Sequence, residues 1–263
     1  FGTDIGETQR QAAKEIGVNV VADIKALCAE SSVIILSLPM AKHVQAVIKG
    51  DGGIIDHAQP KTLIIDTSTS EPEVTRALSI ELDQLGHQLL DCPVSGGPAG
   101  AEAGTMVMVV GGERSALERA QLYLDALSSK VVYMGQSGNG HAAKLINNLL
   151  CAAHLVTTAE AIALGTKAGL DPQDLITGLN AGSGRSAISE VNFPRWILNQ
   201  SFDSGFTMEL MRKDVRLAKN MMGEMELELP LAQQVAEIWS QSEANIPDQD
   251  DFNCIVKNAG LGE

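Results

Sequence analysis

The sequence contains few aromatic residues, since phenylalanine, tyrosine and tryptophan together make up 3% of its 263 residues. A hydrophobic core must therefore be built from aliphatic side chains and methionine, and these are plentiful because 44% of the residues are hydrophobic. Proline is also scarce, with 9 residues against 25 glycines. The length is sufficient for one large domain or for two of ordinary size.

Basic residues are in short supply, with 19 lysines and arginines against 33 acidic residues and a formal net charge of −14. This balance argues against nucleic acid or an anionic membrane surface as a partner. It does not exclude an anionic small molecule, because binding of a small ligand depends on the few groups that contact it.

Cysteine is limited to four widely spaced residues without a CxxC pair: Cys28, Cys92, Cys151 and Cys254. Three of them lie in apolar or periodic segments, so we expect buried free thiols rather than disulfides or a metal site. Free thiols are typical of a reducing compartment. No signal peptide is visible, and we expect a cytoplasmic protein.

Long uninterrupted hydrophobic runs are absent as well. The most apolar stretch, residues 145–170, is broken by polar residues at Asn147, Asn148, His154, Glu160 and Lys167. We therefore expect no membrane span and no membrane partner.

Short continuous apolar runs occur at 31–39 and 61–69, and further strand patterns at 105–112 and 131–135. Runs of this kind are typical of strands that are buried on both faces of a parallel sheet. Helical patterns separate them, as at Ser70-Glu71-Pro72-Glu73, where proline and acidic residues mark a helix start. This alternation predicts an α/β domain with a doubly wound, mostly parallel sheet.

After residue 135 the pattern changes to helices alone, at 138–168, 171–181, 185–200, 207–223 and 229–242. We therefore predict an α/β domain over residues 1–136 and an all-α domain over residues 137–263. The long helix that opens the second domain would join the two.

That helix begins in the stretch GQSGNGHAAKLINN, residues 135–148. Lys144 is followed by Asn147 and Asn148, so an amine and an amide lie on one helical face, one turn apart. This arrangement suggests a catalytic or binding site. The alternative is a solvated lysine with asparagines that cap or pack.

The segment 91–105, DCPVSGGPAGAEAGT, predicts a long loop of small residues after a strand. Ser95 offers a hydroxyl, and Gly96 and Gly97 allow backbone N–H groups to approach an anion. In a doubly wound sheet ligands bind outside the carboxyl ends of the strands, where this loop would lie. The alternative is a flexible crossover loop.

Two other strand ends, Leu38-Pro39 and residues 66–69, would lie along the path of a dinucleotide, or they are ordinary turn residues. Asp4 follows a strand end, where an acid accepts from ribose hydroxyls and repels a 2′-phosphate. The next residues are Ile5 and Gly6 rather than arginine, which favours NAD over NADP. No GxGxxG loop precedes Asp4, so we expect the first strand, this loop and the first helix, about 30 residues, to lie upstream.

The helical pattern at 207–223 carries a basic cluster in an otherwise acidic chain, formed by Arg212, Lys213, Arg216 and Lys219. We expect most of it to be a solvated face. A cation that reaches a cofactor is the alternative.

Five stretches occur in a fixed order: SLP (37–39), IDTST (65–69), DCPVSGGPAGAEAGTM (91–106), GQSGNGHAAKLINN (135–148) and LMRKDVRLA (210–218). Together they resemble the β-hydroxyacid dehydrogenase family, which includes 3-hydroxyisobutyrate dehydrogenase and tartronate semialdehyde reductase. The resemblance implies a Rossmann-like domain, a long interdomain helix, a helical C-terminal domain, and a homodimer or homotetramer. The glycine-rich fingerprint is missing, and His43 departs from the family pattern without an assigned role.

The resemblance also implies an oxidoreductase that transfers hydride between NAD and the hydroxyl-bearing carbon of a small 3-hydroxy acid, or reduces the semialdehyde, without a metal. Lys144 would be the catalytic acid/base and Asn148 would orient the substrate, while Ser95, Gly96 and Gly97 would hold its carboxylate. Leu38, Pro39, Thr69 and Lys213 would line the dinucleotide. A lysine can act as a base here if desolvation lowers its pKa from about 10.4.

Three other functions remain open at this stage. A 6-phosphogluconate dehydrogenase-like enzyme would carry histidine before asparagine where this chain has Asn147, and an imine reductase would usually lack the lysine. A non-catalytic dinucleotide-binding module recruited to chromatin would also tend to lose it, and the charge of −14 argues against such a role.

Overall fold

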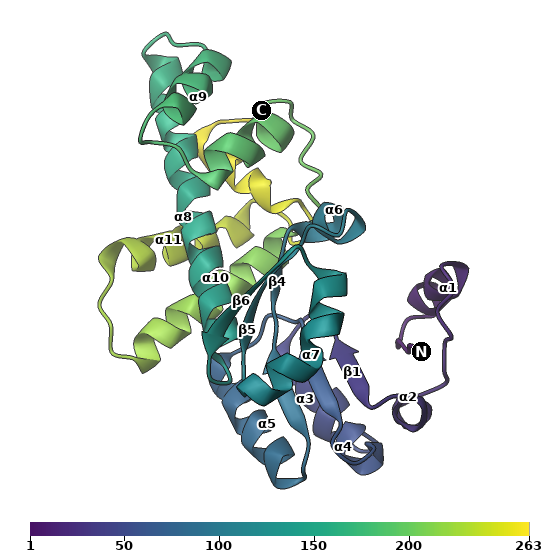
Figure 1. Cartoon of the computed structure of the whole chain (residues 1–263). Coiled ribbons are helices and arrows are strands. Elements are labelled where there is room, and N and C mark those ends of the chain that lie inside the picture. The colour runs from purple at the N-terminus through teal and green to yellow at the C-terminus, as the bar shows by residue number, and fades with distance from the viewer. Residues whose placement is uncertain (263) are drawn as a thin grey trace. The chain divides into compact units, whose positions relative to one another are not determined.

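The computed structural model describes residues 1–262. The chain forms two compact units (Figure 1): unit 1 consists of Phe1–Gly96 and Ala103–Lys144, and unit 2 consists of Gly97–Glu102 and the chain from Leu145 onward. The predicted domain boundary at residue 136 stays a prediction, because compactness alone does not show where an independently folding domain ends.

Unit 1 is built on a six-stranded sheet. Its strands are β1 (Val33–Leu36), β2 (Leu63–Asp66), β3 (Gln88–Asp91), β4 (Val94–Ser95), β5 (Val107–Gly111) and β6 (Lys130–Gly135). The strand order is β1-β2-β3-β5-β4, with β6 paired to β5. β1, β2 and β3 run parallel, so their carboxyl ends meet at one edge of the sheet. The α/β class and the Rossmann-like sheet are confirmed.

β5 and β6 are parallel to each other but run against β3, so the sheet is mixed. The cause lies in the segment 91–105, which was predicted to be a loop but contains β4 and the short helix α6 (Gly97–Glu102). A parallel connection usually needs a crossover helix, and α6 has only 6 residues. The chain instead turns back, and β4 pairs with β5 at Val94↔Met108 and Ser95↔Val107.

The helices of unit 1 are α1 (Glu7–Glu15), α2 (Ile24–Glu30), α3 (Ala41–Lys49), α4 (Ile54–His57), α5 (Pro72–Gln84) and α7 (Arg114–Leu127). Alternate residues of β2 belong to different apolar clusters: Ile64 packs in one, Leu63 and Ile65 in the other. Because both faces of β2 are covered, all four of its residues are buried. This explains why the strand appears in the sequence as a continuous apolar run.

The edge of the sheet at β1 is less protected from solvent. β1 is the terminal strand in the sheet order, and its Ile35 is 43% exposed. No residue of α1 is buried. Gly2 and Val20 form an isolated parallel bridge outside the named strands.

Unit 2 is helical, and the five predicted helices are present. They are α8 (Asn139–Lys167), which begins in unit 1, then α9 (Pro172–Ala181), η1 (Ile188–Ile197), α10 (Met208–Glu224) and α11 (Pro230–Gln241), followed by the 3₁₀ helices η2 (Ser242–Ala244) and η3 (Phe252–Ala259). Phe193, Met211 and Trp239 are buried in its core. η1 is a π-helix with Pro194 inside it. Proline has no N–H to donate, so it disrupts regular α-helical bonding.

Two expectations from composition have different outcomes. Cys28, Cys92 and Cys254 are buried free thiols, as predicted, and Cys151 is a partly exposed one. In contrast, α8 is long and apolar enough to cross a membrane by length and composition alone, although its polar residues led us to expect otherwise. Core helices of soluble proteins also pass this test, and only 28% of its most apolar window is buried within the chain.

Candidate active site

Lys144 and Ser95 lie in contact within unit 1. Lys144 Nζ donates a hydrogen bond of 2.9 Å to Ser95 Oγ, although the two residues are 49 positions apart. Ser95 is held in place by the pairing of β4 with β5 at Val107. Lys144 stands in the second turn of α8. A partly buried ammonium and a hydroxyl therefore converge on one point, where either can reach an oxygen of a bound ligand.

The two glycines after Ser95 have backbone conformations that favour glycine. The φ angles of Gly96 and Gly97 are +132° and +61°. A side chain at either position would be strained, whatever space surrounds it. The chain can therefore turn sharply directly after the Ser95 hydroxyl, as expected for a loop that brings backbone N–H groups to an anion.

Asn148 lies in unit 2, four residues beyond Lys144 on α8. It is 5% exposed, and its Nδ2 donates to Asp214 Oδ2 at 2.6 Å. Its Oδ1 accepts from Asn147 Nδ2 at 3.1 Å, so Asn147 supports Asn148. Lys213 Nζ lies 3.1 Å from Asp214 Oδ1. Asp214 thus holds both an amide and a lysine that the sequence placed in the site.

Asp214 was missed by the sequence reasoning, and the solvated basic face was wrong for two of its four residues. Arg216 and Lys219 are exposed, but Arg212 and Lys213 are 4% and 7% exposed. The burial is possible because each buried cation has an acidic or polar partner in unit 2. The available signal was an aspartate inside a basic cluster on a helix that has one apolar face.

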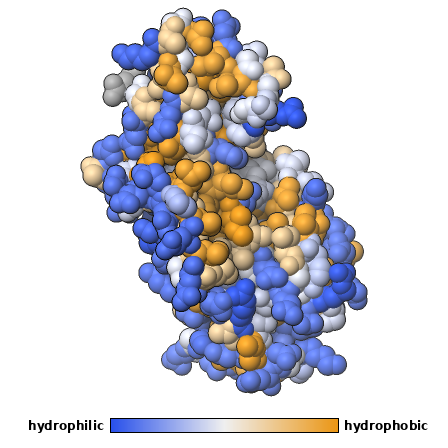
Figure 2. All heavy atoms as spheres, turned by 90° about the vertical axis from the view of Figure 1, so that its left-hand side faces the viewer, coloured by the Kyte–Doolittle hydropathy of each residue, from blue (hydrophilic) through white to orange (hydrophobic). Residues whose placement is uncertain are grey.

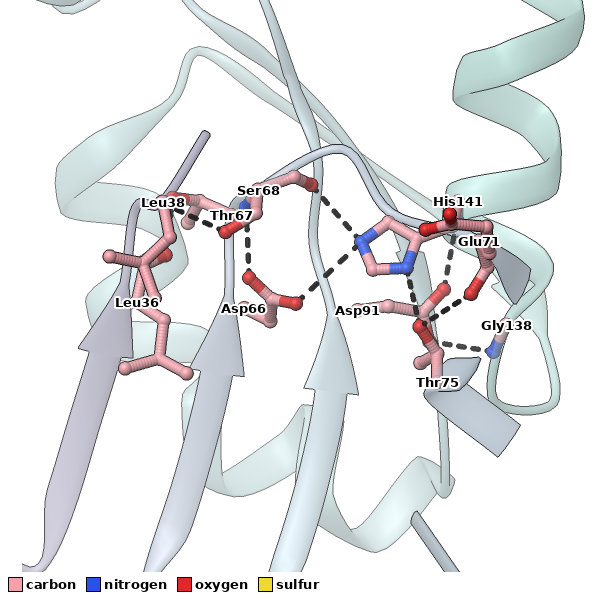
Figure 3. Close-up of polar contacts among 10 residues, drawn as sticks. All are labelled: Leu36, Leu38, Asp66, Thr67, Ser68, Glu71, Thr75, Asp91, Gly138 and His141. Atoms are coloured by element: carbon pink, nitrogen blue, oxygen red, sulfur yellow. Dashed lines mark hydrogen bonds and ion pairs between the residues drawn. The ribbon is translucent and has the colours of Figure 1, made fainter. Parts of the chain in front are cut away.

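The loops after β1 and β2 are tied together at the carboxyl edge of the sheet (Figure 3). Leu38 N donates to Ser68 Oγ at 2.9 Å, and Thr67 Oγ1 donates to the carbonyl oxygen of Leu36 at 2.7 Å. Pro39 and Thr69 are the next residues of these two loops. Three of the sequence-predicted cofactor residues, Leu38, Pro39 and Thr69, therefore belong to one connected edge.

The position of this edge and its polar groups are suited to binding a dinucleotide. Dinucleotides bind at the carboxyl ends of the strands of such sheets. Ser70 Oγ, 1% exposed in the loop after β2, has no hydrogen-bond partner among the described residues. A bound polar ligand would satisfy such a hydroxyl. Among residues 1–262, no group of three or more histidine, cysteine, aspartate or glutamate side chains is placed to hold a metal ion.

Asp4 is exposed and does have an arginine beside it, contrary to the sequence argument. Its Oδ1 accepts from Gly6 N at 2.7 Å, while Arg10 Nη1 donates to the carbonyl oxygens of Asp4 at 2.7 Å and Ile5 at 3.1 Å. Only Ile5 and Gly6 follow Asp4 directly in the sequence, but the first turn of α1 brings Arg10 back to this segment. The preference for NAD over NADP therefore stays a prediction.

A buried polar network at the strand ends was not predicted (Figure 3). His141, which is fully buried, lies 2.7 Å from Thr75 Oγ1 through Nδ1 and 3.0 Å from the carbonyl oxygen of Ser68 through Nε2. A carbonyl can only accept, so Nε2 carries a proton. The same ring nitrogen lies 3.9 Å from Asp66 Oδ2. This histidine links α8 to α5 and to the loop after β2.

Asp91, the last residue of β3, completes this network. Its Oδ1 accepts from Gly138 N and its Oδ2 from His141 N, each at 2.9 Å. Burial raises the pKa of Asp91, while His141 and the two backbone N–H groups oppose that rise. Asp66, Thr75, Asp91 and His141 are called the strand-end network below. Their signal in the sequence was an aspartate that ends each of two buried strands.

Two family profiles match the chain and together cover nearly all of it. The first, described as the NAD binding domain of 6-phosphogluconate dehydrogenase, matches residues 2–135. The second, described as the NAD-binding of NADP-dependent 3-hydroxyisobutyrate dehydrogenase, matches residues 138–259, which include the whole of α8.

The chain is also similar to named relatives, and each match spans most of the relative's length. The chain is 31% identical to 2-(hydroxymethyl)glutarate dehydrogenase of Eubacterium barkeri, over 98% of this chain and 85% of the relative. It is 34% identical to 3-hydroxyisobutyrate dehydrogenase of Pseudomonas aeruginosa, over 83% and 76%.

A solved structure agrees with them. The 3-hydroxyisobutyrate dehydrogenase of Mycobacterium tuberculosis with L-serine superposes with a TM-score of 0.90 at 31% identity, over 98% of this chain and 89% of that one. Profiles, relatives and fold lead to the same group of enzymes. The chain belongs to the β-hydroxyacid dehydrogenase family and is an oxidoreductase that acts on hydroxy acids with NAD(P).

Proposed function

We propose that Lys144 is the general acid/base of this dehydrogenase and that Ser95 holds it in place. The observation that carries the proposal is the 2.9 Å hydrogen bond from Lys144 Nζ to Ser95 Oγ. In the oxidative direction Nζ, once deprotonated, takes the proton of the substrate hydroxyl. In the reductive direction the ammonium returns that proton to the alkoxide that develops on the carbonyl oxygen. The bound nicotinamide supplies the hydride chemistry.

The carboxylate of the substrate would be bound by neutral donors. Ser95 Oγ accepts from Lys144 and so keeps its own proton to donate, and the conformations of Gly96 and Gly97 favour backbone N–H contacts. Asn148 retains one amide proton beside its bond to Asp214, and we propose that it orients the substrate. Leu38, Pro39, Thr69 and Lys213 are proposed to contact the dinucleotide.

The names of the similar proteins narrow the substrate class. The molecules named, 2-(hydroxymethyl)glutarate, 3-hydroxyisobutyrate and L-serine, share a primary hydroxyl on the carbon next to the one that bears the carboxylate. We infer that this chain oxidises a small acid of the form HOCH2–CH(R)–COO⁻ to its semialdehyde. The group R would distinguish one substrate from another.

The Lys144→Ala variant tests the role of the lysine. We expect kcat to fall by about 10²–10⁴-fold or more, with the affinity for dinucleotide unchanged, because a general acid/base acts on proton transfer. Steady-state assays with 3-hydroxyisobutyrate and dinucleotide titrations measure the two effects. Lys49→Ala, which removes an exposed lysine paired with Glu81, is the matched control. Ordinary kcat in Lys144→Ala would rule the assignment out.

Cofactor preference is proposed to be set at Asp4. Its carboxylate accepts from Gly6 N, and we infer that it also receives the ribose hydroxyls and disfavours the 2′-phosphate of NADP. Asp4→Ala should bring kcat/KM for NADP closer to that for NAD, and more so because Arg10 remains nearby. If the ratio of the two values did not change, Asp4 would have no part in the discrimination.

We further propose a cytoplasmic homodimer or homotetramer. Ile146, Leu150 and Leu164 on α8 are 50%, 55% and 73% exposed, a large apolar exposure for one helix. Figure 2 shows the side on which α8 and α11 lie in Figure 1, and apolar side chains gather there in patches. We expect a second copy of this chain to cover these exposed side chains of α8. A monomer mass in sedimentation equilibrium at assay concentration would contradict this.

A further inference from the structure

The start of α8 is capped by a residue from another element. The first N–H groups of a helix have no partner within the helix. Here Asp91, at the end of β3, accepts from the N–H groups of Gly138 and His141 through its two carboxylate oxygens. Asp91 is fully buried, and Figure 3 shows its carboxylate between the strand end and the first turn of the helix.

Glycines allow the backbone to come this close to Asp91. A Cβ atom on Gly111 would lie 2.7 Å and 2.8 Å from the two carboxylate oxygens. A Cβ atom on Gly140 would lie 2.4 Å from the carbonyl oxygen of Asp91 and 2.8 Å from its Oδ2. The Asp91 carboxylate is therefore enclosed on two sides by backbone, and glycine is required at both positions.

Asp91 stands where the segments that carry Ser95 and Lys144 meet. Ser95 follows it by four residues along the chain, and Lys144 follows the capped His141 by three residues on α8. Three residues of helix rise about 4.5 Å, so a shift at the cap is passed to the lysine almost undiminished. The Asp91 carboxylate thus anchors the helix that carries Lys144, and its own strand leads directly into the segment that carries Ser95.

We propose that Asp91 is a positioning residue that fixes the start of α8 on the end of β3 and thereby holds Lys144 Nζ on Ser95 Oγ. The proposal rests on the function proposed for Lys144. Asp91 does not touch the reacting atoms; it acts through the position of the lysine.

The energetics favour this role over a purely structural one. Burial raises the pKa of Asp91, so above that pKa the ionised carboxylate makes the fold less stable than an exposed one would. A neutral serine or asparagine commonly caps a helix without this cost. A buried charge that costs stability but aligns two groups at the site is expected where alignment matters for turnover.

Asp91→Asn in the full-length enzyme is the direct test. Asparagine has the same shape but one acceptor oxygen, so one of the two N–H groups loses its bond. We expect kcat per folded site to fall about 10²-fold, the usual cost of a misplacement near 1 Å. Dinucleotide affinity and the melting temperature should change little, because relief of the buried charge offsets the lost bond. Asp125→Asn, an exposed residue that accepts from Gln121, is the control.

A second variant leaves the carboxylate in place and moves the backbone. Gly140→Ala pushes a Cβ atom against Asp91 and should also lower kcat, whereas Gly223→Ala, in α10 with nothing within 4 Å of its Cβ position, should not. If Asp91→Asn does not fold, this pair still decides the question.

The Lys144→Ala background separates the two proposals. If Asp91 acts through the lysine, Asp91→Asn should cause no further loss of kcat in that background. A further loss of full size there, or a normal kcat per folded site in Asp91→Asn alone, would overturn the positioning role. An active Lys144→Ala enzyme would instead overturn the proposed function.

Discussion

Two buried polar networks, one in each unit, are built in different ways. The strand-end network of unit 1 bonds mainly to backbone groups: Asp91 accepts from two N–H groups, and His141 reaches the carbonyl oxygen of Ser68. In unit 2 Arg212 bonds mainly to side chains at the end of α11 and beyond it. The first network fixes where strands and helices begin and end, and the second fastens one helix to a neighbouring segment.

Arg212 shows how the second network works. Its guanidinium donates to Ser242 Oγ at 3.1 Å and 3.0 Å, to the carbonyl oxygen of Ile246 at 2.8 Å and to Asp248 Oδ1 at 2.6 Å. Arg212 is buried, but the side chain of Asp248 is 62% exposed, so the ion pair itself is partly solvated. Its main effect is therefore to hold the segment 242–248 against α10. Substitutions in the Arg212 network should therefore lower mainly the free energy of unfolding. Substitutions in the strand-end network should lower mainly kcat.

The largest expected effect on stability is that of Arg212→Ala. Several hydrogen bonds from a charged donor are lost and a buried carbonyl is left unpaired, so the free energy of unfolding should fall by about 3 kcal/mol. Urea unfolding measures this loss, and kcat per folded site should stay normal. Arg216→Ala, at an exposed position of the same helix, is the control. If Arg212→Ala lowered kcat and left the free energy of unfolding unchanged, the proposed difference between the two networks would be wrong.

A smaller effect is expected for Thr75→Val in the strand-end network. Valine keeps the shape of threonine but leaves His141 Nδ1 without its 2.7 Å partner, so the free energy of unfolding should fall by about 1 kcal/mol. Because Thr75 supports the histidine and not the cap itself, kcat should fall less than in Asp91→Asn. Thr157→Val, which removes a hydroxyl that donates to the carbonyl oxygen of Ala153 at an exposed position of α8, is the control. Equal losses in both variants would mean that the contact with His141 has no special weight.

The sequence was sufficient for features that depend on local pattern. β2 could be predicted because both of its faces are buried, which leaves a continuous apolar run. The start of α9 was predictable from Asp171-Pro172, and Asp171 indeed accepts from Gln173 N and Asp174 N. Such features need only neighbours along the chain.

Features that depend on distant partners were not predictable in the same way. The reversal of β5 follows from how residues 92–106 fold back, which composition does not show. The contacts of His141 join residues up to 73 positions apart, and nothing in the stretch 135–148 marks that histidine as buried. Ser95 and Lys144 became a pair only through the family resemblance. Asp214 belongs to a matching stretch, but its role appears only in the contacts it makes.

The tight enclosure of Asp91 also limits how this protein can be varied. Gly111 and Gly140 leave no space beside its carboxylate for an added carbon atom. A glutamate at position 91 would have to displace backbone on both sides, and neither glycine can gain a side chain while the aspartate keeps its place. A library that randomises these three positions one at a time should yield almost no active members, so engineering of this region has to start from simultaneous changes or avoid the region altogether.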